Sequence, residues 1–411
     1  TTAMFNYPGY LAIDSTGSVL YLTDYSNAKV RAINLTTNTT SLISNSFVGP
    51  WGIALFNDTT LYVGDWNNCT IQKINLATNA TSTAAGNATC GYAEGNITNA
   101  MFNNPSGLAV NTNGSFLYVA DSTNNRVRRI DLTTNTTSLV AGNGTAGYAE
   151  GVGNQSMMNG AYAISISPDG GYLYVAENQG HRIRRIDLTT NTTSLIAGNG
   201  TRGYREGTGT NAMLNGPSQI SINSEGTMLY FSEPAGNAIR AINLTTNTTS
   251  LVVGNGTPSY LEGNFVDAMV TGEGIVLNPS GTKLYISDSN NNRIRVINLQ
   301  NVYDATVSNV TSGSTAWTNV FVPSSALTKN DNWTCSAIAY DGSVFSNWIN
   351  SSSVMINNSI PTQSIPLLNS SMGLNKTNES LQCFNQSTSD IDSDIITNKI
   401  RWLNNSIAVA S

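Results

Sequence analysis

Short runs of alternating hydrophobic and polar residues, separated by turn-forming Asn, Gly and Thr, cover most of the chain. In the third copy of this pattern the runs predict strands at 106–111, 116–121, 126–132 and 137–141. Their β-branched and aromatic residues suit half-buried strands, and the copies lack a long helical period. The pattern therefore predicts an all-β fold made of four-stranded units.

The four-stranded unit recurs six times. A Leu-Tyr pair in its second strand returns at intervals of 41, 56, 56, 56 and 55 residues, with the tyrosines at Tyr21, Tyr62, Tyr118, Tyr174, Tyr230 and Tyr285. Radial repetition of four antiparallel strands is the architecture of a β-propeller, whereas solenoid repeats are usually shorter. We expect residues 1–305 to form a six-bladed β-propeller.

Three segments of the third copy resemble the NHL repeat family: Pro105-Ser-Gly-Leu-Ala-Val, Leu117-Tyr-Val-Ala-Asp and Asn125-Arg-Val-Arg-Arg-Ile. The insertion Gly144-Thr-Ala-Gly-Tyr-Ala-Glu-Gly, which follows the fourth strand, is also similar to members of that family. The resemblance implies six blades. The first copy lacks the insertion, and the sixth departs from the pattern after Leu299.

An acidic residue ends the second strand of every copy: Asp24, Asp65, Asp121, Glu177, Glu233 and Asp288. Seven residues later five copies carry an arginine, at Arg31, Arg128, Arg184, Arg240 and Arg295, whereas the second copy has Gln72. A short loop between antiparallel strands brings such groups together. A cation-binding ring of carboxylates is one interpretation. A fold-maintaining pair in every blade is favoured, because an active site rarely repeats in each unit.

Propellers of this general shape include metal-dependent lactonases and lyases, whose sites need non-equivalent ligands near the axis. The only histidine is His181, in a turn where other copies have Asn or Ala. We interpret it as a substituted turn residue. No Ser–His–Asp arrangement, phosphate loop or zinc motif is visible. The sequence therefore predicts a protein that is not an enzyme.

The repeats end near residue 305, and the remaining sequence resembles two halves of an immunoglobulin-like domain in reversed order. Residues 306–360 resemble the late half, with Cys335. Residues 361–411 resemble the early half, with Cys383 and, nineteen residues later, Trp402. Three explanations remain open: a permuted domain closed by a Cys335–Cys383 bond, complementation between subunits, and an excerpt of a longer chain with alternating modules.

The other two cysteines, Cys69 and Cys90, belong to one copy and predict a local disulfide. The alternate acids Asp390, Asp392 and Asp394 are a candidate Ca²⁺ site. An EF-hand is ruled out because its sixth position lacks glycine and Arg401 occupies its twelfth. A solvated turn is the favoured alternative, so no cofactor is predicted beyond this candidate calcium ion.

Charged residues make up only 11% of the chain, and the net charge is −6. This charge argues against non-specific nucleic-acid binding, and no apolar run is long enough to span a membrane. The start at Thr1 suggests a processed form or a fragment. Asn-x-Ser/Thr sequons are frequent and predict N-linked glycans on an exported protein; among others they lie at Asn34, Asn38, Asn87, Asn135, Asn143, Asn191, Asn199, Asn247, Asn255, Asn309, Asn332, Asn375 and Asn385.

These features together predict an extracellular, glycosylated structural protein. In this interpretation it is a subunit of a surface filament or surface layer, and copies associate head-to-tail through the split module. The alternative is an adhesion or binding protein, whose propeller face recognises a glycan or a protein.

Overall fold

The computed structural model describes residues 4–254 and 271–299 with their side chains, and the backbones of strands between residues 304 and 410. The chain divides into two compact units. The first consists of Thr1–Glu262 and Val266–Ile297, and the second of Gly263–Phe265 and Asn298–Ser411. The first unit contains the six sequence repeats.

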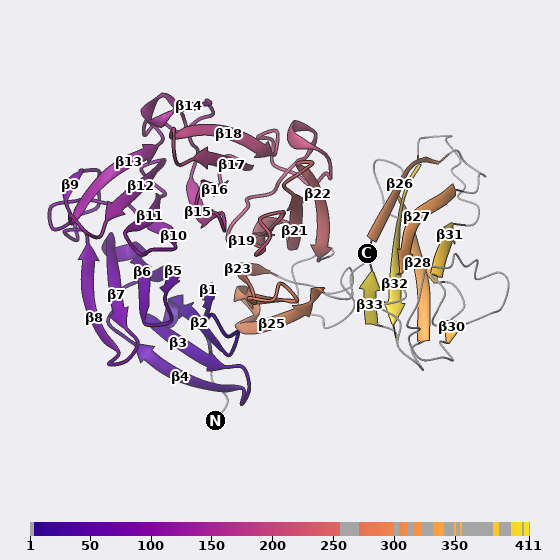
Figure 1. Cartoon of the computed structure of the whole chain (residues 1–411), viewed down its shortest axis with the longest axis horizontal. Coiled ribbons are helices and arrows are strands. Elements are labelled where there is room, and N and C mark those ends of the chain that lie inside the picture. The colour runs from indigo at the N-terminus through magenta and orange to yellow at the C-terminus, as the bar shows by residue number, and fades with distance from the viewer. Residues whose placement is uncertain are drawn as a thin grey trace. The chain divides into compact units, whose positions relative to one another are not determined.

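Six antiparallel sheets, the blades, surround a central axis in the first unit (Figure 1). The strands nearest the axis are β1 (Pro8–Ile13), β5 (Pro50–Phe56), β10 (Pro105–Val110), β15 (Ala161–Ile166), β19 (Ile220–Ile222) and β23 (Gly272–Leu277). The second strands are β2 (Val19–Asp24), β6 (Thr60–Asp65), β11 (Phe116–Asp121), β16 (Tyr172–Glu177), β20 (Met228–Glu233) and β24 (Lys283–Asp288).

The third strands are β3 (Lys29–Asn34), β7 (Thr70–Asn75), β12 (Arg126–Asp131), β17 (Arg182–Asp187), β21 (Ala238–Asn243) and β25 (Arg293–Asn298). The outermost strands are β4 (Thr39–Ser44), β8 (Ala80–Ala85), β13 (Thr136–Ala141), β18 (Thr192–Ala197) and β22 (Thr248–Val253). Two short strands from the insertions, β9 (Gly95–Asn96) and β14 (Gly151–Val152), pair with β13 and β18. The predicted six-bladed, all-β propeller is confirmed, with strand ends within one residue of those expected in the third copy.

Packing between blades explains why the second strands are so apolar. Both faces of β11 are covered, and Leu117, Val119 and Ala120 are fully buried. The same positions of β16, including Leu173 and Val175, are also fully buried. Burial of such side chains stabilises the fold by about 1.5–3 kcal/mol each. No helix in the described part of the chain is long and apolar enough to cross a membrane.

The residue before each third strand has a left-handed backbone. Its φ lies between 50° and 55° in every blade, at Ala28, Cys69, Asn125, His181, Asn237 and Asn292. Asn tolerates this conformation better than most side chains, which explains its prevalence here. The prediction that His181 occupies a turn position is therefore confirmed.

The ring closes between β1 and β23 through side chains. Ser287 Oγ donates to the Gly9 carbonyl at 2.5 Å, and Ser289 Oγ donates to the Pro8 carbonyl at 2.6 Å. The buried Gln219 binds both ends of this junction. Its Oε1 accepts the N–H groups of Leu11 and Ile275, at 3.0 and 2.8 Å. The first five blades are each made of four consecutive strands, so none of these borrows a strand from the far end of the chain.

In the second unit, strands from both predicted immunoglobulin-like halves pair within one chain. One sheet contains β26 (Asp304–Val310), β32 (Ile396–Asn404), β28 (Asn332–Tyr340), β29 (Ile349–Asn350), β30 (Val354–Met355) and β33 (Ile407–Ala410). A second contains β27 (Ala316–Val322) and β31 (Leu381–Asn385). Side chains of the second unit lie outside the described residues, as do its predicted cysteine pair and calcium site.

Candidate functional site

The predicted acid–arginine pairs form in five of the six blades. The separations are 2.5 Å for Arg31–Asp24, 3.1 Å for Arg128–Asp121, 2.8 Å for Arg184–Glu177, 3.2 Å for Arg240–Glu233 and 3.3 Å for Arg295–Asp288. In the second blade Asp65 instead accepts the backbone N–H groups of Val48 and Gly49. All six acids are buried, so these pairs have the geometry of fold-maintaining contacts.

A second carboxylate reaches three of these arginines, and the sequence analysis missed it. Each belongs to the insertion of the preceding blade: Glu94 at 3.0 Å from Arg128, Glu150 at 3.6 Å from Arg184 and Glu206 at 2.8 Å from Arg240. The first blade has no insertion, and the blade after it has Gln72 in place of arginine. The insertion and the arginine of the following blade are therefore absent together. This was the signal in the sequence that could have revealed the contact between blades.

Burial perturbs the acids of these clusters. It raises the pKa of Asp121 to about 6 and that of Glu177 to about 7, although Arg128 and Arg184 act in the opposite direction. Glu177 also lacks a hydrogen-bond partner at Oε2. The folded protein binds the proton of Glu177 more tightly than the unfolded chain does. Protonation of Glu177 at low pH therefore stabilises the folded state.

We expect the Glu177→Gln variant to gain stability relative to the unmodified protein as pH rises. The unfolded glutamate loses its proton near pH 4.5 and the folded one near pH 7. The stability that the bound proton provides is therefore present below pH 4.5 and is lost as pH rises through 7. The free energy of unfolding of the variant, relative to that of the unmodified protein, should rise by on the order of 2 kcal/mol between pH 5 and pH 8. Urea unfolding curves at the two pH values measure this change. Asp187 is partly exposed, and the Thr190 and Thr189 backbone N–H groups lower its pKa, so Asp187→Asn should show no such rise.

The residues at the mouth of the central channel, unlike these clusters, differ from blade to blade. The equivalent position near the start of the innermost strand holds Gly9, Trp51, Ser106, Tyr162, Ser218 and Glu273. Circular arrangement of the blades brings residues together that are far apart in the sequence. A site made of non-repeating residues therefore exists near the axis, which the sequence analysis did not predict.

Glu273 is the carboxylate of this site. Its Oε1 accepts a hydrogen bond from the Tyr7 hydroxyl at 3.0 Å, and its Oε2 accepts one from Ser218 Oγ at 2.9 Å. Burial raises the pKa of Glu273, and the two hydroxyl donors counteract part of this effect. Among the described residues no lysine, arginine or histidine forms an ion pair with it.

An aromatic cluster lies beside Glu273. Trp51 is its centre, and the ring centroids of five neighbours lie 5.0–6.1 Å away: Tyr7, Tyr10, Tyr25, Trp66 and Tyr162. Tyr25 and Trp66 come from the 3₁₀ turns η1 (Tyr25–Asn27) and η2 (Trp66–Asn68), which join the second and third strands. Tyr7 stacks on Trp51 and the other four rings are tilted or edge-on to it, which are favourable arrangements of aromatic rings. The cluster gives one side of the channel mouth an aromatic wall.

A cavity of about 560 Å³ connects the axis to the loops of the fourth and fifth blades. Its lining residues are Tyr162, Asn178, Gln179, His181, Arg202, Asn215, Gly216, Pro234, Ala235 and Glu273. The cavity has the size of a small-molecule site, and its polar groups come from three blades.

The cavity adds a second role to His181. His181 Nδ1 accepts the Gly216 N–H at 3.1 Å, so the proton of the neutral ring is on Nε2. Burial lowers the pKa of His181, and the nearby Arg202 and Arg182 lower it further. The imidazole is therefore neutral near pH 7: its Nε2–H can donate a hydrogen bond, and its basic nitrogen, Nδ1, is engaged by the Gly216 N–H.

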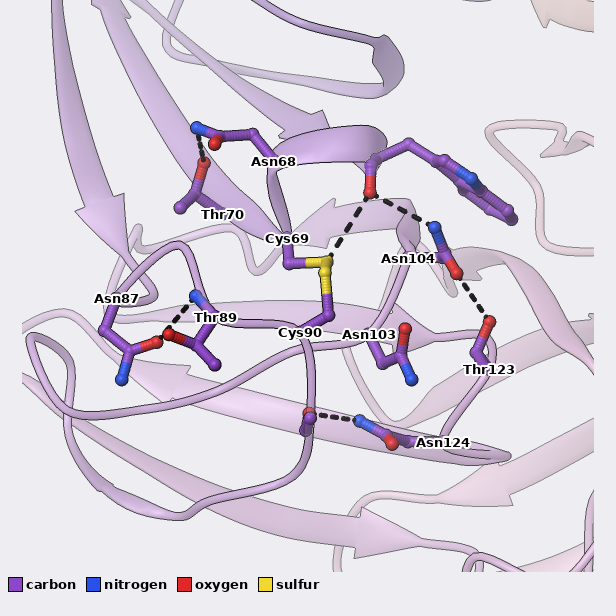
Figure 2. The surroundings of a disulfide bond; sticks show 12 residues. Asn68, Cys69, Thr70, Asn87, Thr89, Cys90, Asn103, Asn104, Thr123 and Asn124 are labelled. Carbon is purple, nitrogen blue, oxygen red and sulfur yellow. Dashed lines mark hydrogen bonds between the residues drawn. A yellow bond between two sulfur atoms is a disulfide. The ribbon is translucent and has the colours of Figure 1, made fainter.

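The predicted disulfide between Cys69 and Cys90 is present (Figure 2). It joins the left-handed turn before β7 to the insertion that carries Glu94. Asn124 of the third blade donates to the Gly91 carbonyl in the same insertion at 2.7 Å. The disulfide thus lies in the segment through which the second blade contacts the third.

Seven of the predicted sequons occupy two kinds of turn. Those between third and fourth strands have a left-handed backbone and comprise Asn38, Asn135, Asn191 and Asn247. Those that follow the fourth strands accept the backbone N–H two residues later and comprise Asn87, Asn143 and Asn199. Asn34 accepts two such N–H groups after β3. Attachment of glycans to these residues stays a prediction, and the remaining predicted sequons lie outside the described residues.

Within the described residues there is no group of three His, Cys, Asp or Glu side chains that could hold a metal ion. The candidate calcium ligands Asp390, Asp392 and Asp394 lie outside those residues. The polar side chains of the cavity are one carboxylate, one guanidinium, one imidazole, one phenol and amides. This set suits an organic ligand with hydrogen-bonding groups.

Fold and site together define a six-bladed β-propeller with a ligand-sized cavity at its channel mouth. Residues 1–303 match the family described as "Lactonase, 7-bladed beta-propeller", and the chain belongs to this family. It has six blades where the family description names seven.

The chain is also similar to proteins outside that description. It is 30% identical over 218 residues to Protein SUPPRESSOR OF QUENCHING 1, chloroplastic, of Arabidopsis thaliana, covering 50% of this chain and 21% of that protein. It is 28% identical over 162 residues to NHL repeat-containing protein 2 of Bos taurus, covering 37% and 22%. The chain thus spans about a fifth of the length of these curated relatives. The predicted resemblance to NHL repeats is confirmed.

Among solved structures, the fold is similar to an auxiliary nutrient binding protein from Bacteroides thetaiotaomicron. The TM-score is 0.58 and the sequence identity 19%, over 71% of this chain and 69% of the other. At this identity the likeness concerns the fold alone.

Proposed function

We propose that this chain is an extracellular binding protein, and that its propeller takes a small polar organic ligand at the channel mouth. One observation carries the proposal: the cavity is lined by residues that differ between blades, whereas most other contacts repeat. Repeated residues maintain the fold, so residues that break the repeat at a single concave site point to a specific ligand. A propeller of the same fold is described as an auxiliary nutrient binding protein, which agrees with a binding role.

An extracellular location is supported by the Cys69–Cys90 disulfide, because disulfides persist in oxidising compartments. The sequons agree with export, and N-linked glycans are part of the proposal. Self-assembly through the second unit is the weaker candidate. Because β28 pairs with β32 of the same chain, head-to-tail complementation would require these strands to exchange between subunits.

Filling the cavity should abolish ligand binding without unfolding the protein. Ala235 lines the cavity and is exposed, so the Ala235→Trp variant would occupy the ligand volume. The unmodified protein is screened against a panel of saccharides, amino acids, amines and lactones. We expect some of these compounds to raise its melting temperature in a saturable way. The Ala235→Trp variant should not show this rise. Ala77→Trp, at an exposed turn between β7 and β8, is the matched control. If no compound stabilises the unmodified protein, or if Ala235→Trp responds equally, the proposal is wrong.

Lactone hydrolysis is the second candidate function, favoured by the family to which the chain belongs. Glu273 is the one carboxylate of the cavity and the group best placed to act as a base there. We expect the unmodified protein to leave lactones of the panel intact. Saturable hydrolysis that is lost in the Glu273→Gln variant would assign an enzyme instead.

A further inference from the structure

Within the part of the chain that the structure describes, no cationic side chain pairs with the charge of Glu273. Both of its oxygens accept hydrogen bonds from neutral hydroxyl groups, those of Tyr7 and Ser218. The acids that end the second strands differ, since each is paired with arginine or with backbone N–H groups. An enclosed carboxylate without a counter-charge favours a cation next to it, because few waters there can solvate the charge.

The surroundings of Glu273 decide which kind of cation would fit. A metal ion would need further oxygen, nitrogen or sulfur ligands, and the described residues offer no group of three acidic, His or Cys side chains. The cavity instead places the ring of Tyr162 with Glu273, and the aromatic cluster continues behind Tyr162 through Trp51 and Trp66. Aromatic rings attract organic cations through their negative faces, and a carboxylate strengthens the attraction.

The remaining charge in the cavity orients such a ligand. Arg202 Nε donates to Asn215 Oδ1 at 2.9 Å, and the guanidinium is exposed at the loop after the fourth blade. His181, also on that side, is held neutral by burial and by Arg202 and Arg182, as its lowered pKa indicates. A positive group is therefore disfavoured near Arg202 and favoured at Glu273.

We propose that Glu273 and Tyr162 form a subsite for an organic ammonium ion within the cavity. The inference rests on the proposed function and names the chemical class of its ligand. Ionised Glu273 supplies the counter-charge and Tyr162 an aromatic face, while Tyr7 and Ser218 hold the carboxylate in place. Binding is electrostatic, so it weakens as salt concentration rises.

The test compares cations with neutral molecules of the same shape. Choline is paired with 3,3-dimethyl-1-butanol, and benzylamine with benzyl alcohol. Binding is followed by the fluorescence of Trp51 and Trp66 and by calorimetry at pH 8. We expect at least one cation to bind at least about tenfold more tightly than its neutral counterpart, a difference of about 1.4 kcal/mol. Glu273→Gln should remove this preference, and Tyr162→Leu should weaken cation binding severalfold.

Glu225→Gln, at an exposed acid between β19 and β20, is the matched control and should bind like the unmodified protein. Circular dichroism and melting temperature establish that each variant is folded. The inference is overturned if neutral and cationic members bind equally, if Glu273→Gln retains the preference, or if neither cation binds. When another panel compound still binds and is blocked by Ala235→Trp, the proposed function stands without the cation subsite. When nothing binds, both are wrong.

Discussion

Replacing Arg240 with Met should lower the free energy of unfolding by about 3–5 kcal/mol, because removal of one partner from a buried ion pair leaves the other charge unpaired. The side chain of Arg240 is fully buried. It forms ion pairs with Glu206 and Glu233, at 2.8 and 3.2 Å, and donates to the backbone carbonyls of Met213 and Arg205. The substitution thus removes the arginine donor from two acids and two carbonyls.

Arg31 provides the matched comparison for Arg240. Its side chain is 16% exposed, and Asp24 is the one acid within ion-pair distance among the described residues. We expect Arg31→Met to cost about 1 kcal/mol. Urea unfolding at pH 8 followed by tryptophan fluorescence measures both variants. Equal losses would mean that the insertion acid Glu206 contributes nothing. At pH 5 the stability lost in Arg240→Met should be smaller than at pH 8. Burial raises the pKa of Glu233 and Arg240 lowers it, so without Arg240 this acid takes up a proton more readily at pH 5.

Removing the disulfide should cost roughly 3 kcal/mol, since the bond closes a loop of 21 residues and so restricts the unfolded chain. The sequence itself provides the least disruptive substitutions. Cys69 has a left-handed φ of 54°, close to the 51° of its counterpart Asn125 in the third blade, and Ala146 is the counterpart of Cys90 there. The double variant Cys69→Asn/Cys90→Ala therefore removes the bond and keeps residues that this turn and insertion accept elsewhere in the ring.

Removal of the disulfide should also destabilise the insertion that contains Cys90 locally. Without the bond, the insertion that carries Glu94 is still held to the third blade by the β9–β13 pairing, by Arg128 and by Asn124, but it is no longer tied to the turn before β7. Hydrogen exchange should accelerate at Gly91, whose N–H donates to the Phe102 carbonyl, more than at the equivalent Gly147. A reducing agent should destabilise the unmodified protein by roughly 3 kcal/mol more than it destabilises the double variant. Equal effects of the reductant on both proteins would show that the loss in the double variant has another cause.

Much of the propeller could be predicted because it repeats. The Leu-Tyr period located the second strands, and the seven-residue spacing from Asp121 to Arg128 indicated an ion pair, as found at 3.1 Å. The Cys69–Cys90 bond was also predictable, because both cysteines belong to one blade. Contacts between blades were harder to predict: Glu94 and Arg128 are 34 residues apart, and the packing of the second blade's insertion on the third blade brings them together.

The channel mouth could not be found by a search for repeats, since the site consists of residues that depart from them. Glu273 stands where the other blades have Gly, Trp, Ser or Tyr, and a comparison of the copies position by position would have singled it out. Its proximity to Tyr7 depends on the closure of six blades, which no local pattern encodes. His181 was assigned correctly to a turn, but its place in a cavity depends on the neighbouring Arg202 loop and Gly216.

The way the ring closes has a consequence for its evolution. The first and sixth blades meet through Ser287, Ser289 and Gln219, and each of the first five blades is one uninterrupted stretch of sequence. Duplication or deletion of one 56-residue stretch would add or remove a whole blade and leave every other blade intact. A lineage built this way can change its number of blades in a single genetic event. Such a change offers a simple route from seven blades to six within one family.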